Sequence, residues 1–261
     1  MPQSTGLCGR SFLVTRPEGQ AEGLLAGIRA LGGHAAHIPF LAIEPVPAQG
    51  ALEAIARASN DYAATIFISA NAVRMAWLSL STGQDSWPEN RVAACIGPGT
   101  ARALVELGVH QIIVPAAQYD TEGLLAEAFF AQPHCEGKAF ALIRGEGGRD
   151  VLAQSLRARG ARVDEVAVYR RTLHPDALER LQDWMASGGG TLLISSSESL
   201  RCLISAAPRA VQQELITQPL LVPHSRIAEV ARELGFNRVT VTAGGDVGML
   251  DALRSYNAGD T

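Results

Sequence analysis

The chain has 261 residues, a net charge of −4, and a composition that is 47% hydrophobic and 18% charged. A chain of this kind can bury large cores, which excludes general disorder, and its length most naturally fits two domains. The absence of basic runs argues against a protein that binds nucleic acid mainly through its phosphates. Lys138 is the one lysine among the 22 basic residues. This arginine bias indicates either codon usage in a GC-rich genome or a ligand rich in carboxylates, which planar guanidinium groups suit.

Two other classes of protein are also excluded. The sequence has no apolar run near the roughly 20 residues of a membrane helix, and its start lacks the pattern of a secretory signal. We therefore expect a cytoplasmic protein that neither spans nor binds a membrane. The four cysteines are scattered and form no CxxC pair, as is typical of reduced thiols. The spacing of histidines and cysteines indicates no metal ligand set, and we expect neither a metal nor a cofactor.

Taken in chain order, the sequence alternates short apolar runs with helical patterns. The runs are rich in β-branched residues, which is typical of strands buried on both faces, and the helical patterns end at glycines such as Gly108 and Gly235. This alternation predicts an α/β fold with parallel sheets flanked by helices. The predicted strands are residues 12–15, 65–69, 91–97, 111–115, 140–144, 191–195, 220–223 and 238–242.

Two extended segments, residues 37–47 and 163–173, break this alternation. They are marked by proline or by charge and occupy matching places in the two halves of the chain. We expect them to pair as a two-stranded connector between two similar lobes, with the crossing strands near residues 38–47 and 163–172.

The two halves of the chain also repeat each other. Arg144 follows Arg16 by 128 positions, and Ser195 follows Ser69 by 126. Four segments recur in the same order at nearly constant spacing, which indicates a duplicated unit of strand, turn and helix.

Polar side chains gather where predicted strands end and helices begin. Parallel sheets bind ligands beyond the carboxyl ends of their strands, and helix starts attract anions through their free amides. The alternative is that these side chains only cap the helices, as we expect Thr100 to do in the turn GPGT. The predicted substrate-binding residues of this kind are Ser69, Asn71, Thr100, Ser195, Ser196, Ser197, Ser199 and Ser225.

Further candidates surround the turn RGEGGRD. We expect Arg144, Gly145 and Arg149 to hold ligand carboxylates, together with Arg16 in the matching place of the first half. The alternative is a surface turn with solvated arginines. A nucleotide site is rejected because the third glycine of GxGxxG and a GK[ST] phosphate loop are both missing. Tyr169, on the second connector, is the candidate proton donor, and its alternative role is simple packing.

Together these segments resemble the uroporphyrinogen-III synthase family from Ser11 to Leu253. The resemblance rests on the order of VTRP, FISANAV, IGPGTA, EGLL, IRGEGGR, the connector with Tyr169, LLISSSES and AGGDVGMLDAL. One departure is Ile227, which stands at the place of a threonine in the family's second GxxTA turn. Ser225 or His224 would supply the polar group there, if one is needed at all.

The resemblance implies a discontinuous architecture. One lobe would comprise residues 1–37 and 173–261, the other residues 38–172, with the active site in the cleft between them. We expect a monomer.

The resemblance also implies a lyase of tetrapyrrole (haem) biosynthesis that needs no cofactor. Its substrate would be hydroxymethylbilane, which it would cyclise to uroporphyrinogen III with loss of water and inversion of ring D. Tyr169 would assist departure of the hydroxyl, and the arginines and strand-end groups would hold the acetate and propionate side chains. A transient contact with the preceding deaminase is left open, and no nucleic acid is expected. The alternative is a two-lobed cytosolic module that binds an anionic small molecule without catalysis.

Overall fold

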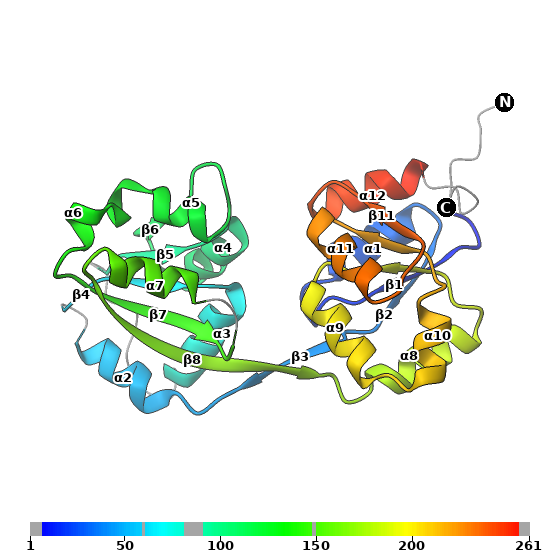
Figure 1. The fold of residues 1–261 in the computed structure, drawn as a ribbon, viewed down its shortest axis with the longest axis horizontal. Helices are drawn as coiled ribbons and strands as arrows, with labels where there is room; N and C mark the ends of the chain where they lie inside the picture. The colour runs from blue at the N-terminus through cyan, green and yellow to red at the C-terminus, as the bar shows by residue number, and fades with distance from the viewer. Residues whose placement is uncertain (1–6, 59–60, 81–90, 148–149, 256–261) are drawn as a thin grey trace. The chain divides into compact units, whose positions relative to one another are not determined.

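The computed structural model describes residues 7–58, 61–80, 91–147 and 150–255. Contacts divide the chain into two compact units. Unit 1 is Met1–Ala42 with Thr172–Thr261, and unit 2 is Ile43–Arg171. Each unit has a central sheet covered by helices (Figure 1). Within the described ranges, no helix combines the length and the apolar character that a membrane span requires.

Unit 1 is built on a five-stranded parallel sheet with the order β11-β10-β9-β1-β2. Its strands are β1 (Ser11–Val14), β2 (His34–His37), β9 (Thr191–Leu193), β10 (Leu220–Val222) and β11 (Val239–Val241). Its helices are α1 (Glu22–Ala30), α8 (Ala177–Ala186), α9 (Ser197–Ala206), α10 (Arg209–Leu215), α11 (Ser225–Glu233) and α12 (Gly245–Ser255).

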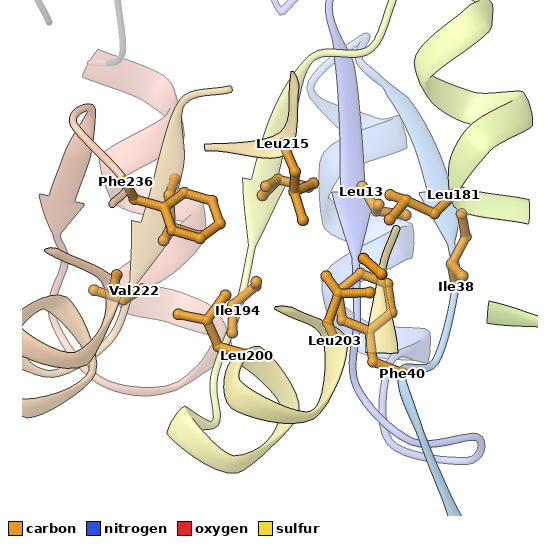
Figure 2. Packing of buried hydrophobic residues seen from close by; sticks show 14 of the residues in the cluster. Leu13, Ile38, Phe40, Leu181, Ile194, Leu200, Leu203, Leu215, Val222 and Phe236 are labelled. Atoms are coloured by element: carbon orange, nitrogen blue, oxygen red, sulfur yellow. The ribbon is translucent and has the colours of Figure 1, made fainter. Parts of the chain in front are cut away.

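Both faces of this sheet are buried, because successive residues of a strand point to opposite sides. Leu13 of β1 packs in one cluster with Phe40 and Leu181 (Figure 2). Its neighbours Phe12 and Val14 pack in a second cluster on the other face. A strand buried on both sides needs an uninterrupted apolar run, which is why β1 reads as a continuous apolar segment.

Unit 2 is built on a six-stranded sheet with the order β3-β8-β7-β4-β5-β6. Its strands are β3 (Leu41–Pro45), β4 (Tyr62–Phe67), β5 (Ala93–Cys95), β6 (Ile112–Ile113), β7 (Ala139–Gly145) and β8 (Arg162–Leu173). Its helices are α2 (Gln49–Arg57), α3 (Ala70–Leu80), α4 (Pro98–Glu106), α5 (Thr121–Ala126), the 3-10 helix η2 (Ala128–Phe130), α6 (Gln132–Cys135) and α7 (Val151–Ala158). Strand β7 supplies Ala141 and Ile143 to one core cluster and Phe140 and Leu142 to the other.

Strands β3 and β8 form the connector. The amide of His174 donates to the carbonyl of Phe40, and the amide of Val46 donates to the carbonyl of Val168. Partner numbers fall on one strand as they rise on the other, so the pair is antiparallel. The division between the units falls within these two strands, between Ala42 and Ile43 and between Arg171 and Thr172.

The predicted fold class is confirmed: α/β, two lobes with parallel sheets, and a two-stranded connector. Every predicted strand overlaps an observed one. The prediction was incomplete at residues 163–173, because β8 also pairs in parallel with β7 as an interior strand of unit 2. Its residues Val163, Val166 and Val168 are buried, so the charges between them obscured a strand with a buried face.

Candidate functional site

A pocket of about 350 Å³ lies in unit 2, where the neighbouring parallel strands β4, β5, β7 and β8 end their pairing. This is the edge of a parallel sheet where ligand sites form, because the chain turns there into loops and helix starts. We call it the Tyr169 pocket. Its lining residues are Ile68, Ile96, Tyr119, Asp120, Thr121, Glu122, Leu142, Arg144, Gly145, Gly147, Val151, Leu152, Tyr169 and Arg171.

Tyr169 lies in the pocket wall because the pairing of β7 with β8 is irregular there. Arg144 pairs with Ala167, whereas the next residue, Gly145, pairs with Tyr169, so Val168 is an extra residue. A bulge of this kind breaks the alternation of side chains along a strand. As a result Val168 and Tyr169 are both buried, with 0% and 1% of their surface exposed.

The Tyr169 hydroxyl contacts two polar side chains. Its Oη lies 3.1 Å from Ser69 Oγ and accepts a hydrogen bond of 2.8 Å from Arg171 Nη2. The Arg171 guanidinium carbon also lies 5.1 Å from the centre of the Tyr169 ring, within the range of a cation–π contact. Ser69 Oγ accepts from the amide of Ala72 at 3.1 Å. Ser69 therefore caps α3 and contacts the phenol at the same time.

Gly145 allows the Tyr169 ring to lie against the end of β7. A Cβ atom built on Gly145 would lie 2.6 Å from Cζ and 2.7 Å from Cε2 of Tyr169. The predicted role of Gly145 in binding is thus joined by a steric one, since only glycine leaves room for the ring.

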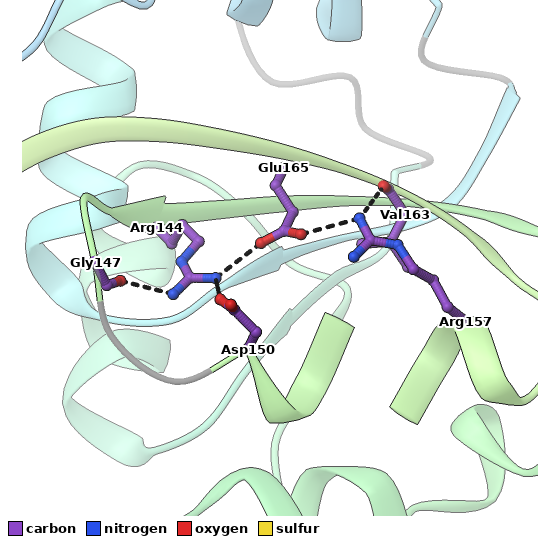
Figure 3. Close-up of polar contacts among 6 residues, drawn as sticks. All are labelled: Arg144, Gly147, Asp150, Arg157, Val163 and Glu165. Atoms are coloured by element: carbon purple, nitrogen blue, oxygen red, sulfur yellow. Dashed lines mark hydrogen bonds and ion pairs between the residues drawn. The ribbon is translucent and has the colours of Figure 1, made fainter. Parts of the chain in front are cut away.

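Arg144 lines the same pocket, but carboxylates of the protein hold its guanidinium (Figure 3). Its Nη1 donates to Asp150 at 2.7 Å and to Glu165 at 2.8 Å, and its Nη2 donates to the carbonyl of Gly147 at 2.6 Å. Burial acts to lower the pKa of Arg144, but the hydrogen bonds and charges of Asp150 and Glu165 outweigh it and raise that pKa. This guanidinium therefore stays charged and is held in one orientation.

Glu165 extends this arrangement to a second arginine. Its Oε1 accepts from Arg157 Nη2 at 2.9 Å, and the same nitrogen donates to the carbonyl of Val163 at 2.9 Å (Figure 3). The network joins the end of β7, the start and end of α7, and β8. Protein carboxylates thus contact Arg144, for which the sequence predicted a ligand carboxylate. The third candidate in this turn, Arg149, lies outside the described residues.

Two acidic residues also line the pocket. Asp120 is the N-cap of α5 and accepts from the amide of Gly123 at 2.8 Å, and Glu122 is exposed beside it. The hydrogen bond from Gly123, followed by one from Gln118, lowers the pKa of Asp120 below its ordinary value of 3.8. The pocket thus has cationic and anionic side chains in its lining, an arrangement suited to a ligand with both carboxylates and N–H donors.

Thr100 does not cap α4 as the sequence predicted. The N-cap is Gly97, and it makes no side-chain cap hydrogen bond, while Thr100 lies inside the first turn with 8% of its surface exposed. The proline at the first helical position already supplies a helical φ angle and needs no amide partner there, so the helix begins before Thr100. Asn71 is the second residue of α3 and is half-buried.

In unit 1, one serine of the run after β9 acts as a cap. Ser196 is the N-cap of α9, and its Oγ accepts from the amide of Ser199 at 3.3 Å. Ser199 is itself only 3% exposed, so its hydroxyl is covered. Ser195 and Ser197 flank the cap and are half-buried.

The other two candidates of unit 1 also lie at strand ends. Arg16 follows β1, and its Nη1 pairs with Asp246 Oδ1 of α12 at 2.5 Å. Ser225 is the first residue of α11, and its N-cap, His224, makes no side-chain cap hydrogen bond. These residues and the serines of α9 belong to unit 1. In unit 2, Gly145 and Tyr169 line one pocket, and Ser69 contacts the Tyr169 hydroxyl.

The sequence analysis missed Asp120, Glu122 and Arg171 of this pocket. For Arg171 a signal was present in the sequence, because residues two apart in a strand point to the same face, so Arg171 had to accompany Tyr169. Among the described residues, no group of three or more His, Cys, Asp or Glu side chains is placed to hold a metal ion.

The chain is similar to several known proteins. The family model described as "Uroporphyrinogen-III synthase HemD" matches residues 22–249. Uroporphyrinogen-III synthase of Escherichia coli is 31% identical over 241 residues, which cover 90% of this chain and 96% of that protein. The enzyme of Salmonella typhimurium is 32% identical over 244 residues, with the same coverage.

Solved structures show the same fold. A mutant uroporphyrinogen III synthase from Thermus thermophilus matches with a TM-score of 0.61 at 20% identity, over 95% of this chain and 98% of that one. The Helicobacter pylori uroporphyrinogen-III synthetase matches with a TM-score of 0.61 at 14% identity, over 95% and 100%. From the family model and the sequence relatives together, the chain belongs to the uroporphyrinogen-III synthase family.

Proposed function

We propose that this chain cyclises the linear tetrapyrrole hydroxymethylbilane to uroporphyrinogen III, with loss of water and inversion of ring D, as a lyase of haem biosynthesis. The observation that carries the reaction is the family match, which spans residues 22–249. The Tyr169 pocket supports the place of the chemistry, because it holds a phenol with two polar side chains on its oxygen.

The reaction requires that the substrate be held in the right position more than it requires a strong nucleophile. Once the terminal hydroxyl has left, the substrate is reactive enough to close by itself to the symmetric isomer. The protein must favour attack at the substituted carbon of ring D, and holding reacting groups in place can supply up to about 7–11 kcal/mol. A preference of about 4 kcal/mol between the two routes is already a thousandfold in product ratio. A site without a catalytic triad is sufficient for this task.

Tyr169 is the group that assists departure of the hydroxyl. The C–O bond of the terminal hydroxymethyl group breaks, and the oxygen takes the bonding electron pair together with the phenolic proton, so it leaves as water. The pyrrole is left as an azafulvenium cation beside a phenolate. The cationic carbon bonds to the substituted carbon of ring D and forms a spiro intermediate. The bond from that ring carbon to the bridge of ring C then breaks, and the bridge carbon bonds to the unsubstituted α-carbon of ring D, so the ring is inverted. That α-carbon releases its proton, which restores the phenol, so the protein is unchanged by the cycle.

The size of the pocket fits one end of the substrate. A volume of about 350 Å³ is near the lower limit of ligand pockets, so it holds a terminal pyrrole ring and not the whole chain of four. Asp120 and Glu122 would face the N–H group and the positive charge of the azafulvenium, and Arg171 would face the developing phenolate.

The remaining substrate carboxylates need donors elsewhere. Ser195, Ser196, Ser197 and Ser225 lie at the N-termini of α9 and α11, where free amides and the helix dipole favour anions. Arg16 is a weaker candidate because Asp246 already pairs with it. Thr100 and Ser199 are weaker candidates as well, because both are buried.

The test is incubation with freshly made hydroxymethylbilane, oxidation of the products and separation of the isomers by chromatography. We expect isomer III in excess over the spontaneous isomer I. Isomer I alone, with the substrate nevertheless retained by the protein, would instead support the alternative of a module that binds without catalysis.

The substitution Tyr169→Phe tests the role of Tyr169 as proton donor. Tyr169→Phe removes the proton donor, and turnover should fall about a hundredfold, the lower end of the range for general acid catalysis. Tyr62→Phe is the matched control, because its hydroxyl donates to Asp164 at the opposite end of the same sheet. Equal turnover in the Tyr169→Phe variant and the unmodified protein would remove Tyr169 from the chemistry.

A further inference from the structure

We infer that Arg171 is a positioning residue that aims the Tyr169 proton into the pocket and stabilises the phenolate that proton donation leaves behind. The inference rests on the proposed function of Tyr169 and deepens it. The supporting observation is that the Arg171 side chain contacts both the oxygen and the ring of Tyr169.

The backbone places the two residues together. Tyr169 and Arg171 lie two apart on β8, and both line the same pocket. Arg171 Nη2 lies 2.8 Å from Tyr169 Oη while its Cζ lies 5.1 Å from the ring centre. One planar guanidinium thus contacts both the oxygen and the ring, and a ring so held has little freedom to turn.

The direction of the hydrogen bonds follows from the chemistry of the groups. A guanidinium has donors only, so Tyr169 Oη must accept from Arg171. Ser69 Oγ already accepts from the amide of Ala72, and its own hydrogen is available for Oη at 3.1 Å. Either hydroxyl of this pair can donate to the other. When Ser69 donates, both lone pairs of Oη are occupied, and the phenolic hydrogen is left to point into the neighbouring pocket.

The same two donors serve the state after proton transfer. The phenol O–H bond breaks, the proton goes to the departing hydroxyl, and the electron pair stays on Oη. That oxygen then carries a full negative charge beside a guanidinium and the Ser69 hydroxyl. Before proton transfer the guanidinium donates to a neutral oxygen, whereas afterwards donor and acceptor carry opposite charges and attract each other more strongly. Arg171 therefore stabilises the product of the step more than its reactant, which is the condition for a gain in rate.

A direct role in substrate binding is the competing explanation, because Arg171 lines the pocket and could hold a carboxylate. The two roles predict different kinetics. A residue that holds a carboxylate in both ground and transition states mainly raises KM, whereas one that acts through the Tyr169 oxygen lowers kcat. Only the second role depends on the presence of that oxygen.

The experiment is a double-mutant cycle with Arg171→Met, Tyr169→Phe and the combined variant, measured as kcat and KM for formation of uroporphyrinogen III. We expect Arg171→Met to lower kcat about a hundredfold, the loss typical of one transition-state donor, with little change in KM. In the Tyr169→Phe background the same substitution should change kcat less than about threefold, because no oxygen remains to be stabilised.

Two further variants separate this role from a general loss of structure. Arg170→Gln removes the neighbouring exposed arginine, which pairs with Glu44, and should leave kcat unchanged. Arg171→Lys keeps one charged donor and should retain more turnover than Arg171→Met, with circular dichroism reporting that each variant is folded.

The outcomes are distinct. A raised KM that persists in the Tyr169→Phe background, or a normal kcat in both Arg171 variants, overturns the role of Arg171 and leaves that of Tyr169 standing. A normal kcat for Tyr169→Phe itself overturns the proposed function of Tyr169 and this inference with it. Excess isomer III in all variants would still identify the enzyme.

Discussion

Gly145 determines how closely the Tyr169 ring lies to the end of β7. A methyl group at this position would lie 2.6 Å from Tyr169 Cζ, so Gly145→Ala must push the ring away from Ser69 and Arg171. We expect turnover to fall about a hundredfold, as for a misplacement of about 1 Å in a catalytic group. The free energy of unfolding should fall by about 1–3 kcal/mol through overpacking. Steady-state kinetics and chemical denaturation measure the two effects.

Gly50→Ala is the matched control for this substitution. Gly50 lies in α2 of the same unit, and a Cβ atom there would meet nothing within 4 Å. The control should keep full turnover and gain up to about 1 kcal/mol of stability from helix propensity. Full turnover of the Gly145→Ala variant would mean that the exact place of the ring does not matter to the reaction.

At the scale of residues, strand-end chemistry was readable from the sequence and its partners were not. Ser69 follows the parallel strand β4, where the rule for such sheets predicts a ligand-facing group. Tyr169 lies inside β8, where the pairing with β7 ends. Arg144 fitted the same rule, yet Asp150 and Glu165 hold its guanidinium. The choice between a ligand carboxylate and a protein carboxylate depends on tertiary distances that no local pattern contains.

The network around Arg144 joins several elements, so the loss of the Arg144 side chain should destabilise the protein. Arg144 has only 12% of its side chain exposed, and its loss leaves Asp150 and Glu165 without their shared partner. We expect Arg144→Met to lower the free energy of unfolding by about 1.5–3 kcal/mol, the range for hydrogen bonds that involve charged groups. Urea denaturation at low and high salt would measure it.

Arg162 provides the comparison for that measurement. It pairs with Asp164 on the same strand β8, but both side chains are well exposed, at 62% and 41%. Exposed pairs of this kind contribute about 0–1 kcal/mol, so Arg162→Met should have little effect. If the two variants lose equal stability, the network around Arg144 is no more than a solvated ion pair, and Arg144 becomes available again as a ligand for the substrate.

The start of α5 should show a dependence on pH. The hydrogen bond from Gly123 lowers the pKa of Asp120 below 3.8, so the folded state favours the ionised form. The contribution of Asp120 to stability is complete above about pH 4 and is lost as the pH falls through its lower folded-state pKa. The difference in Tm between the unmodified protein and Asp120→Ala should therefore be constant from pH 7 to pH 5 and shrink below pH 4.

Asp120→Asn separates the charge from the cap. Asparagine caps a helix about as well as aspartate but does not titrate, so the difference in Tm between Asp120→Asn and Asp120→Ala should not change between pH 7 and pH 3. A difference between unmodified protein and Asp120→Ala that grows on acidification would contradict the lowered pKa.

At the scale of elements, long apolar strands were predictable and mixed ones were not. The pattern of β7 is continuous because both of its faces are buried. Strand β8 carries charged residues between its valines and pairs with β3 on one side and β7 on the other. Because of these charged residues, the sequence analysis interpreted β8 only as part of the connector. The bulge that brings Tyr169 into the pocket wall depends on pairing with β7 and leaves no mark in local sequence.

The two sheets have the same order when the repeats are aligned. Strands β1, β4, β5 and β6 of the first half correspond to β7, β9, β10 and β11 of the second. In one sheet β1 lies beside β9, followed by β10 and β11, and in the other β7 lies beside β4, followed by β5 and β6. Each unit thus combines the first strand of one repeat with the rest of the other. The repeat was visible in the sequence, but this exchange follows from long-range pairing, and only the family resemblance predicted it.

The exchange leaves each unit with its own cores, which predicts that a core defect stays within its unit. The clusters that contain Leu181 and Phe12 draw on unit 1 alone, and those that contain Leu104 and Leu142 draw on unit 2 alone. Leu104→Ala and Leu181→Ala remove side chains that are both 0% exposed, and each should cost about 2–5 kcal/mol. Hydrogen exchange followed by mass spectrometry would report which segments lose protection.

We expect Leu104→Ala to raise exchange in α3, α4 and β5 of unit 2 while β1, β9 and β10 of unit 1 keep their protection, and Leu181→Ala to do the reverse. The pair of variants controls for itself, because the same side chain is removed from an equally buried place in each unit. Equal loss of protection in both units from either variant would show that the chain unfolds as a single cooperative body. The two strands β3 and β8 would then transmit stability between cores that share no side chain.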